Sequence, residues 1–148
     1  PGLHVTHIDH VSVLITDVAR SRRFYAGVLG LREIPKPKTF DFVALWFDLG
    51  DGHTLHLLKK DEPDTISPRH FCLRVTDAAA ARAHLARHGV ETRETTLIPG
   101  ADRFFVSDPD QSWTGYDFSV TSPPTSFDRL FTFFWTISMS SRTSSITS

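Results

Sequence analysis

The chain is poor in cysteine, in unbalanced charge and in long apolar runs. It has a single cysteine, Cys72, among 148 residues, which excludes an internal disulfide framework and favours a reducing, cytoplasmic location. The formal net charge is −1, so no overall field attracts nucleic acid or an anionic membrane surface. No apolar run is long enough to span a bilayer. We therefore expect one compact domain with no nucleic-acid or membrane partner.

Histidine and glutamate are missing from the last third of the chain. None of the eight histidines lies beyond His88, and no glutamate follows Glu94. The earlier part contains an internal repeat, in which residues 10–17 (HVSVLITD) are matched by residues 70–77 (HFCLRVTD). A helical pattern that stops at a glycine, Gly30 or Gly89, follows each copy. A repeat in so short a chain predicts one supersecondary unit used twice.

The hydrophobic periodicity predicts the same order of elements in both halves. In the first half it predicts a strand over 7–15, a helix capped by Asp17, and strands over 31–34, 42–49 and 53–59. In the second half it predicts a strand from 70, a helix over 78–87 capped by Asp77, and strands over 91–97, 102–107 and 115–120. We therefore expect a single domain over 1–120, made of module one (5–59), a linker (60–69) and module two (70–120). Residues 121–148 form a Ser/Thr-rich tail that we expect to be partly disordered.

Four polar residues occupy strands that this repeat would relate by symmetry. His10 and His70 open the two copies and would converge if the first strands of the modules lay side by side. His56 lies between apolar neighbours on the fourth strand, and Asp117 has a similar setting on the last strand. Two imidazoles suit a divalent ion such as Zn, Ni, Fe or Mn, so these four residues are the candidate metal ligands. The alternative for each is an ordinary structural or solvated side chain.

Other residues are assigned to a pocket or to the surface. Cys72 shares the strand face of His70 and could border a substrate pocket, although a small buried side chain is the simpler interpretation. Phe42 and Trp46, on the strand before His56, are assigned to the same pocket. His84 lies on the second predicted helix beside arginines, which indicates an exposed face.

The sequence resembles the vicinal oxygen chelate superfamily, which includes glyoxalase I, fosfomycin-resistance thiol transferases, extradiol dioxygenases and bleomycin-binding proteins. The resemblance covers about 5–110 and is carried by five segments: 7–13 (HIDHVSV), 21–25 (SRRFY), 28–31 (VLGL), 70–77 (HFCLRVTD) and 104–110 (FFVSDPD). Segments 37–42 (PKTFDF) and 55–58 (LHLL) look closest to a glyoxalase I-like subgroup.

The resemblance implies the fold and the chemistry. The fold class is α+β, with two βαβββ modules that form a cupped, mostly antiparallel sheet around a divalent metal. The metal would bind vicinal oxygens of the substrate and stabilise an enolate or oxyanion. By motif position, His10 and His70 match the metal histidines of the family, and His56 matches a ligand position that varies among members. The modules would close their sheets within a homodimer.

The C-terminus is atypical for this superfamily. Members usually continue after Asp-Pro-Asp with Gly-Asn and a strand that bears a glutamate ligand, whereas Asp110 is followed here by QSWTG. Asp117 is the candidate replacement, and the alternative is a remodelled or frameshifted tail. Because the glutamate is also the family's candidate general base, we assign no catalytic residue.

Three functions follow from the resemblance. The first is a divalent-metal-dependent lyase or isomerase of the glyoxalase I (lactoylglutathione lyase) type, acting on a small molecule with vicinal oxygens and made doubtful by the missing glutamate. The second is a thiol transferase of the fosfomycin-resistance type, which would use a thiol cosubstrate such as glutathione. The third is a non-catalytic module of the bleomycin-resistance type that only binds its ligand.

Overall fold

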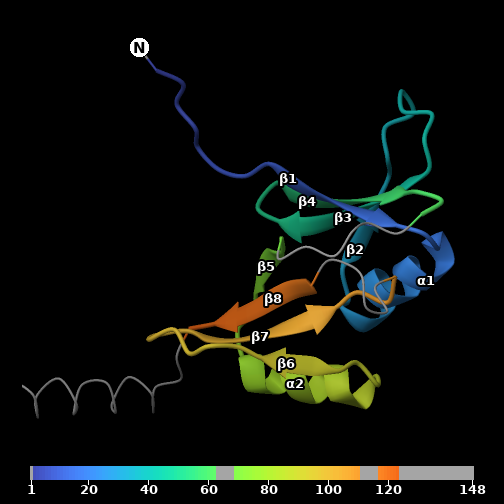
Figure 1. Cartoon of the computed structure of the whole chain (residues 1–148). Coiled ribbons are helices and arrows are strands. Elements are labelled where there is room, and N and C mark those ends of the chain that lie inside the picture. Colours follow the sequence, from blue (N-terminus) through green and yellow to red (C-terminus); the bar gives the residue numbers. More distant parts are fainter. Residues whose placement is uncertain (1, 63–68, 111–116, 124–148) are drawn as a thin grey trace, which may run out of the picture.

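The chain folds into two modules, each built on a four-stranded mixed sheet, in a computed structural model that describes residues 2–62, 69–110 and 117–123 (Figure 1). The first sheet has the order β1-β4-β3-β2 and the second has the order β5-β8-β7-β6. The first sheet comprises β1 (His10–Ile15), β2 (Arg32–Ile34), β3 (Ala44–Gly50) and β4 (His53–Lys59). The second comprises β5 (Phe71–Arg74), β6 (Thr92–Glu94), β7 (Asp102–Ser107) and β8 (Asp117–Ser122). The predicted α+β class and the repeated strand order are confirmed.

Each module pairs its first strand in parallel with its last and its other strands antiparallel. β1 runs parallel to β4, and β5 runs parallel to β8. Several sequence-based expectations are wrong. The strand predicted over 7–15 begins only at His10, and the strand predicted over 91–97 ends at Glu94. The first strands of the modules do not lie side by side, because β1 and β5 are edge strands of different sheets. The last strand also ends two residues later than predicted, so Thr121 and Ser122 belong to β8 and not to a tail. Residues 124–148 lie outside the described residues.

Helices follow the first strand of each module and begin at the predicted caps. The Asp17 carboxylate accepts the Arg20 amide at 2.9 Å at the start of α1 (Val18–Arg22). The Asp77 carboxylate accepts the Ala80 amide at 2.9 Å at the start of α2 (Ala78–Arg87). Such caps satisfy amides that have no partner within the helix. The first helix continues as a π-helix, η1 (Arg23–Val28), and none of the described helices is long and apolar enough to cross a membrane.

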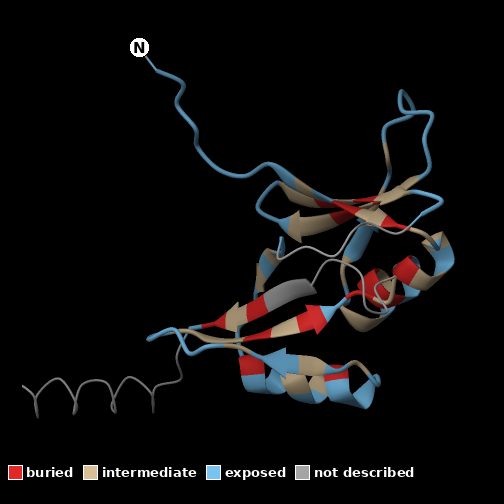
Figure 2. Cartoon of the chain, viewed as in Figure 1, coloured by how far each residue is buried: buried red, intermediate tan, exposed pale blue. Residues whose placement is uncertain are grey.

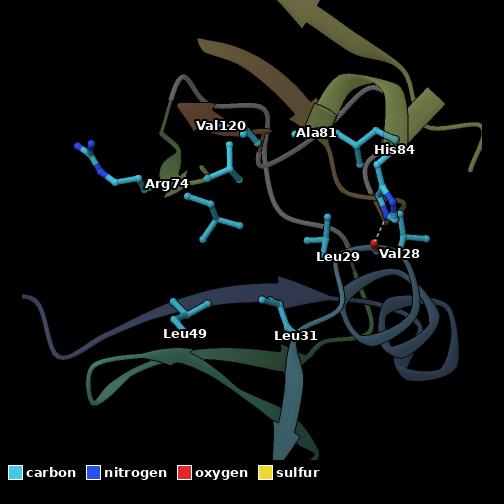
Figure 3. Close-up of a pocket in the computed structure, with 11 residues that line it drawn as sticks. Val28, Leu29, Leu31, Leu49, Arg74, Ala81, His84 and Val120 are labelled. Carbon is cyan, nitrogen blue, oxygen red and sulfur yellow. Dashed lines mark hydrogen bonds between the residues drawn. The ribbon is translucent and has the colours of Figure 1, made fainter. Parts of the chain in front are cut away.

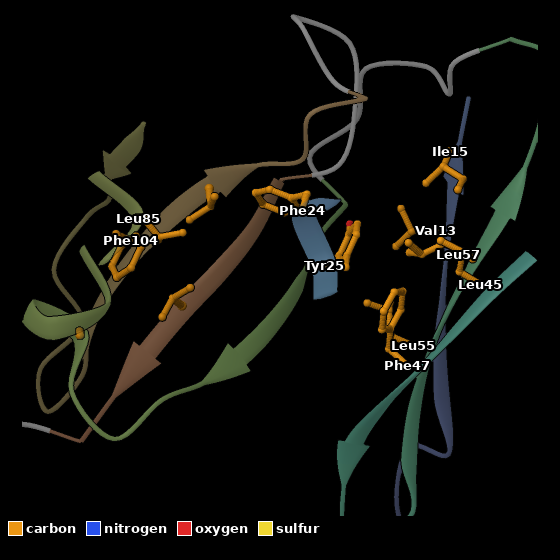
Figure 4. Close-up of a cluster of buried hydrophobic side chains, with 13 residues drawn as sticks. Val13, Ile15, Phe24, Tyr25, Leu45, Phe47, Leu55, Leu57, Leu85 and Phe104 are labelled. Carbon is orange, nitrogen blue, oxygen red and sulfur yellow. The ribbon is translucent and has the colours of Figure 1, made fainter. Parts of the chain in front are cut away.

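One hydrophobic core joins the two sheets. Strand alternation places Val13, Leu45 and Leu57 on the buried face of the first sheet, while Phe104 and Val106 belong to the second. Phe24 and Tyr25, from η1, lie between these two groups (Figure 4). The buried residues gather along this shared interior, whereas the N-terminal arm and the loop before β3 are exposed (Figure 2). Because the buried faces of both sheets contribute to one core, their other faces point away from it.

The Asp110 side chain ties the second module to the first turn of α1. Its Oδ1 accepts the Thr16 hydroxyl at 2.6 Å and the Thr16 and Asp17 amides at 3.2 Å. Arg20 and the Ser21 hydroxyl donate to the same carboxylate, of which only 3% is exposed. These donors lower the pKa of Asp110 to about 2, even though burial acts in the opposite direction. The carboxylate is therefore ionised and saturated with donors at the junction of the modules.

Asp108 lies beside this junction, but its pKa is shifted in the opposite direction from that of Asp110. It is buried, and burial raises its pKa to about 6, although hydrogen bonds from Tyr25 and from the Asp110 amide act against this shift. One of its oxygens, Oδ2, has no hydrogen-bond partner among the described residues. The fold therefore favours the protonated form of Asp108.

A cavity of about 330 Å³ remains between the modules, lined mainly by aliphatic side chains of both (Figure 3). His84 lies at its edge, and its Nε2 contacts the Val28 carbonyl at 2.7 Å. The expectation that His84 marks an exposed helix face is therefore wrong, because the side chain is half-buried and links α2 to the end of η1.

We expect Asp110→Ala to lower the free energy of unfolding by about 1–3 kcal/mol, because several buried donors would lose their acceptor. Urea unfolding followed by circular dichroism measures the change. Asp61→Ala is the matched control, since Asp61 is fully exposed and its ion-pair partner among the described residues is the exposed end of Lys59 at 3.1 Å. That control should change stability by less than about 0.5 kcal/mol. Equal effects of the two substitutions would contradict the role given to Asp110.

We also expect stability to fall between about pH 4 and pH 6, by no more than about 3 kcal/mol, as Asp108 ionises. The sign follows from a folded-state pKa of about 6 against an ordinary value of 3.8, so the stabilising contribution is complete below pH 4 and lost through pH 6. Asp110 behaves oppositely and loses its contribution only as the pH falls from about 4 through 2.

Urea unfolding of the protein and of Asp108→Asn at several pH values tests this assignment. All other titratable groups are common to both proteins, so the difference between the two profiles isolates Asp108. Parallel profiles would refute the assignment.

Candidate functional site

The open face of the first sheet brings two of the predicted ligands together. Ser12 on β1 and Trp46 on β3 are both register partners of His56 on β4. His10 lies two residues before Ser12 and therefore shares this face. The intervening residues, such as Val13, Leu55 and Phe47, fill the core on the opposite face. The strand alternation therefore leaves polar and aromatic side chains exposed or half-buried on this face.

His56 is stacked between His10 and Trp46. Its ring centroid lies 3.8 Å from that of Trp46 at an angle of 9°, and 4.5 Å from that of His10 at an angle of 17°. Burial lowers the pKa of His56, and the facing His10 lowers it further. The neutral imidazole is the form that binds a metal ion, so this environment favours ligation.

Each imidazole has one ring nitrogen engaged by a neighbouring side chain. The Asp9 carboxylate lies 2.8 Å from His10 Nδ1, and this hydrogen bond lowers the pKa of Asp9. The Thr54 hydroxyl lies 2.9 Å from His56 Nε2. Such partners fix the orientation of a metal-binding histidine and leave the other nitrogen for the ion. We did not single out Asp9 and Thr54 from the sequence, although each is close in sequence to its histidine, at one and two residues.

A cavity of about 350 Å³ lies over this face of the sheet. His10 and His56 line it together with Asp9, Ser12, Thr54 and Leu58. Phe42 and Trp46, which we assigned to the substrate pocket, also line it. Phe40, which we did not assign to the pocket from the sequence, completes the aromatic side of the cavity.

The other predicted site residues lie on the second sheet. His70 precedes β5, and its ring contacts that of Phe105 on β7 with centroids 5.0 Å apart. Cys72 is exposed on β5, so its interpretation as a buried apolar residue is wrong. Neither residue lines the cavity of the first sheet. Among the described residues of one chain, no group of three or more His, Cys, Asp or Glu side chains could hold a metal ion.

Strand register corrects the proposed symmetry between His56 and Asp117. In the first module, Ser12 is the register partner of His56. The repeat aligns Ser12 with Cys72, and the register partner of Cys72 is Ser119. The counterpart of His56 in the second module is therefore Ser119. Asp117 immediately precedes Phe118, the partner of Phe71, and so lies level with His70 at the same end of neighbouring strands. The side chain of Asp117 lies outside the described residues.

A sequence model of the Glyoxalase/Bleomycin resistance protein/Dioxygenase superfamily matches residues 7–116. The chain belongs to this superfamily. Within it, the chain is 31% identical over 119 residues to the protein Glyoxylase I 4 of Arabidopsis thaliana, a match that covers 73% of this chain and 68% of that protein.

Solved structures of the superfamily share the fold. A glyoxalase family protein from Bacillus anthracis superposes with a TM-score of 0.74 at 24% identity, covering 84% of this chain and all of that one (100%). A mutant of the fosfomycin resistance protein FosX from Listeria monocytogenes superposes with a TM-score of 0.66 at 14% identity, covering 86% and 98% of the two chains. That structure holds Mn(II) and 1S,2S-dihydroxypropylphosphonic acid. Members of the superfamily therefore bind divalent metals and small molecules.

The donor atoms on the open face fit part of such a metal site. Two imidazoles with oriented rings are suitable ligands for a divalent ion, and the depressed pKa of His56 keeps that ring neutral. Protein sites of this kind use about three or four protein ligands, of which His10 and His56 would supply two.

Proposed function

We propose that the protein is a divalent-metal-dependent lyase or isomerase of the glyoxalase I type, with His10 and His56 as metal ligands. The stacked pair of oriented imidazoles beside a 350 Å³ cavity carries this proposal. The similarity to Glyoxylase I 4 of Arabidopsis supports it. The substrate would be a small molecule with vicinal oxygens, and a thiol cosubstrate such as glutathione is part of the proposal. The single cysteine agrees with a reducing compartment such as the cytoplasm.

A homodimer would complete the site. The open face of the first sheet points away from the second module of its own chain, and β1 and β5 are both edge strands. If β1 of one protomer lay beside β5 of its partner, His10 and His56 would face His70 of the partner subunit. Asp117 of the partner subunit, level with that histidine, is the proposed fourth ligand. Two such sites would form, related by the twofold axis.

The residues of the chain would orient the ligands and shape the pocket. A metal ion held here would act as a Lewis acid toward the vicinal oxygens of the substrate. Asp9 holds the His10 ring through Nδ1, and Thr54 holds the His56 ring through Nε2. Proton transfer at the adjacent carbon requires a general base, and Asp9 is the one carboxylate among the described residues that line the cavity.

A binding module without turnover is the second candidate. The absence of any glutamate after Glu94 favours it, because the family's usual ligand and general base is then missing. Under this alternative the same cavity would hold a small molecule without converting it. A thiol transferase would use the same histidines, and an assay with a thiol and an epoxide would separate it from the lyase.

We expect His10→Ala and His56→Ala each to weaken Mn²⁺ or Zn²⁺ binding by at least about 10-fold, because each removes one imidazole ligand. Isothermal titration calorimetry and elemental analysis of dialysed protein measure this. His88→Ala is the matched control, since His88 is the exposed C-cap of α2, its ring contacts His84, and neither histidine lines the cavity of the first sheet. If both variants kept the metal affinity of the unmodified protein, the first sheet would not hold the metal.

We expect metal binding to be recovered when two variant chains, each lacking a different part of the proposed site, form a mixed dimer. One chain would carry His10→Ala with His56→Ala, and the other would carry His70→Ala. After co-refolding, random pairing gives mixed dimers in half of the molecules, each with one intact site, so about a quarter of the sites should recover. Sedimentation verifies the dimer. No recovery in mixed dimers would show that the two halves of the site do not meet across a subunit interface.

A further inference from the structure

Three aromatic rings form a wall on one side of the cavity that contains His10 and His56. Phe40 and Phe42 lie in the loop before β3, and Trp46 lies on β3 itself. The centroids of Phe40 and Phe42 are 5.2 Å apart, and those of Phe40 and Trp46 are 6.0 Å apart. We name Phe40, Phe42 and Trp46 the aromatic wall. We propose that this wall binds a planar aromatic group of the ligand, an inference that rests on the proposed site.

The exposure of the wall indicates that it is a binding surface. Phe40 and Phe42 keep 42% and 44% of their surface accessible, and both line the same cavity as the two histidines. Neighbouring exposed phenyl rings are costly in water, and grouped apolar surface beside polar groups is typical of ligand sites. A ligand that covers these rings would recover the free energy of burial.

The geometry of the rings favours a planar partner. Phe40 is inclined by 44° to both Phe42 and Trp46, so the three rings are not stacked on one another. Aromatic pairs prefer offset or inclined contacts at centroid distances of about 4.5–7 Å. A conjugated ring between these side chains could therefore make more than one favourable ring contact. An aliphatic ring of the same size would bury similar area without these contacts.

The loop that carries the wall is held in place before any ligand binds. The Phe40 amide donates to the Pro37 carbonyl at 3.2 Å, and the Lys36 ammonium donates to the Phe40 carbonyl. The same ammonium lies 5.4 Å from the centroid of the Phe42 ring. Pro35 and Pro37 further restrict the backbone. Such preorganisation lowers the entropic cost of binding, which is the property expected of a recognition surface.

The test compares an aromatic probe with its saturated counterpart. Naphthalene-2-carboxylate and decahydronaphthalene-2-carboxylate share a fused-ring skeleton and a charge, and differ in planarity and conjugation. Binding of each probe to the metal-free chain of 148 residues is measured by calorimetry. We expect the aromatic probe to bind about 5- to 10-fold more tightly, as one or two ring contacts predict. Because no metal is present, this result does not depend on whether the histidines ligate an ion.

Matched variants test whether the aromatic wall causes the preference for the aromatic probe. Phe40→Leu and Phe42→Leu keep apolar bulk and remove one ring each, so each should reduce the preference for the aromatic probe at least 2-fold. Val43→Ala is the control, because Val43 is exposed in the same loop but does not line the cavity. Circular dichroism verifies that each variant is folded.

Three outcomes would overturn the inference. The first is equal affinity for the two probes in the unmodified protein. The second is an unchanged preference in both leucine variants. The third is loss of the dimer in Phe40→Leu or Phe42→Leu by sedimentation, which would mean that a second copy of the chain covers the wall. Metal binding measured separately on the same variants distinguishes these outcomes from failure of the metal site.

Discussion

The orientation of the two modules depends on the contact between Asp110 and the first turn of α1. The carboxylate comes from the turn after β7, while its donors come from Thr16, Asp17, Arg20 and Ser21 of the first module. Burial of an ion is costly unless its oxygens are fully hydrogen-bonded, and this one is saturated. The arrangement therefore tolerates little displacement, and it sets the first sheet relative to the second.

This orientation decides where chemistry can occur. The buried faces of both sheets turn toward one core. The polar face of each sheet therefore points away from the other module. His10 and His56 consequently meet on one open face, while His70 lies on another sheet. A single chain would thus hold two partial ligand sets, which is why we propose that the complete site lies between subunits. The aromatic wall adjoins the first set, so ligand selection and metal binding would share one cavity.

Local signals predicted much of the fold. The strand over 53–59, the helix over 78–87 and the strand over 102–107 agree with the structure at both ends, because turn glycines and helix caps mark their limits in the sequence. The end of the last strand was predicted two residues too early, at 120 and not at Ser122, since the Ser/Thr-rich composition from Thr121 onward is not typical of a strand. The supposed equivalence of Asp117 and His56 failed for a related reason: register depends on backbone pairing between distant strands, and no local pattern records it.

The sequence by itself determined the repeated βαβββ unit, the superfamily, and the assignment of His10 and His56 to strands. These depend on periodicity and on short segments, which are local properties of the chain. Only the tertiary structure decided that His56 is stacked between His10 and Trp46, that Asp9 and Thr54 orient the imidazoles, and that His70 lies on a separate sheet. Those facts depend on strand order and on the docking of one module against the other, and long-range contacts such as that of Asp110 set both.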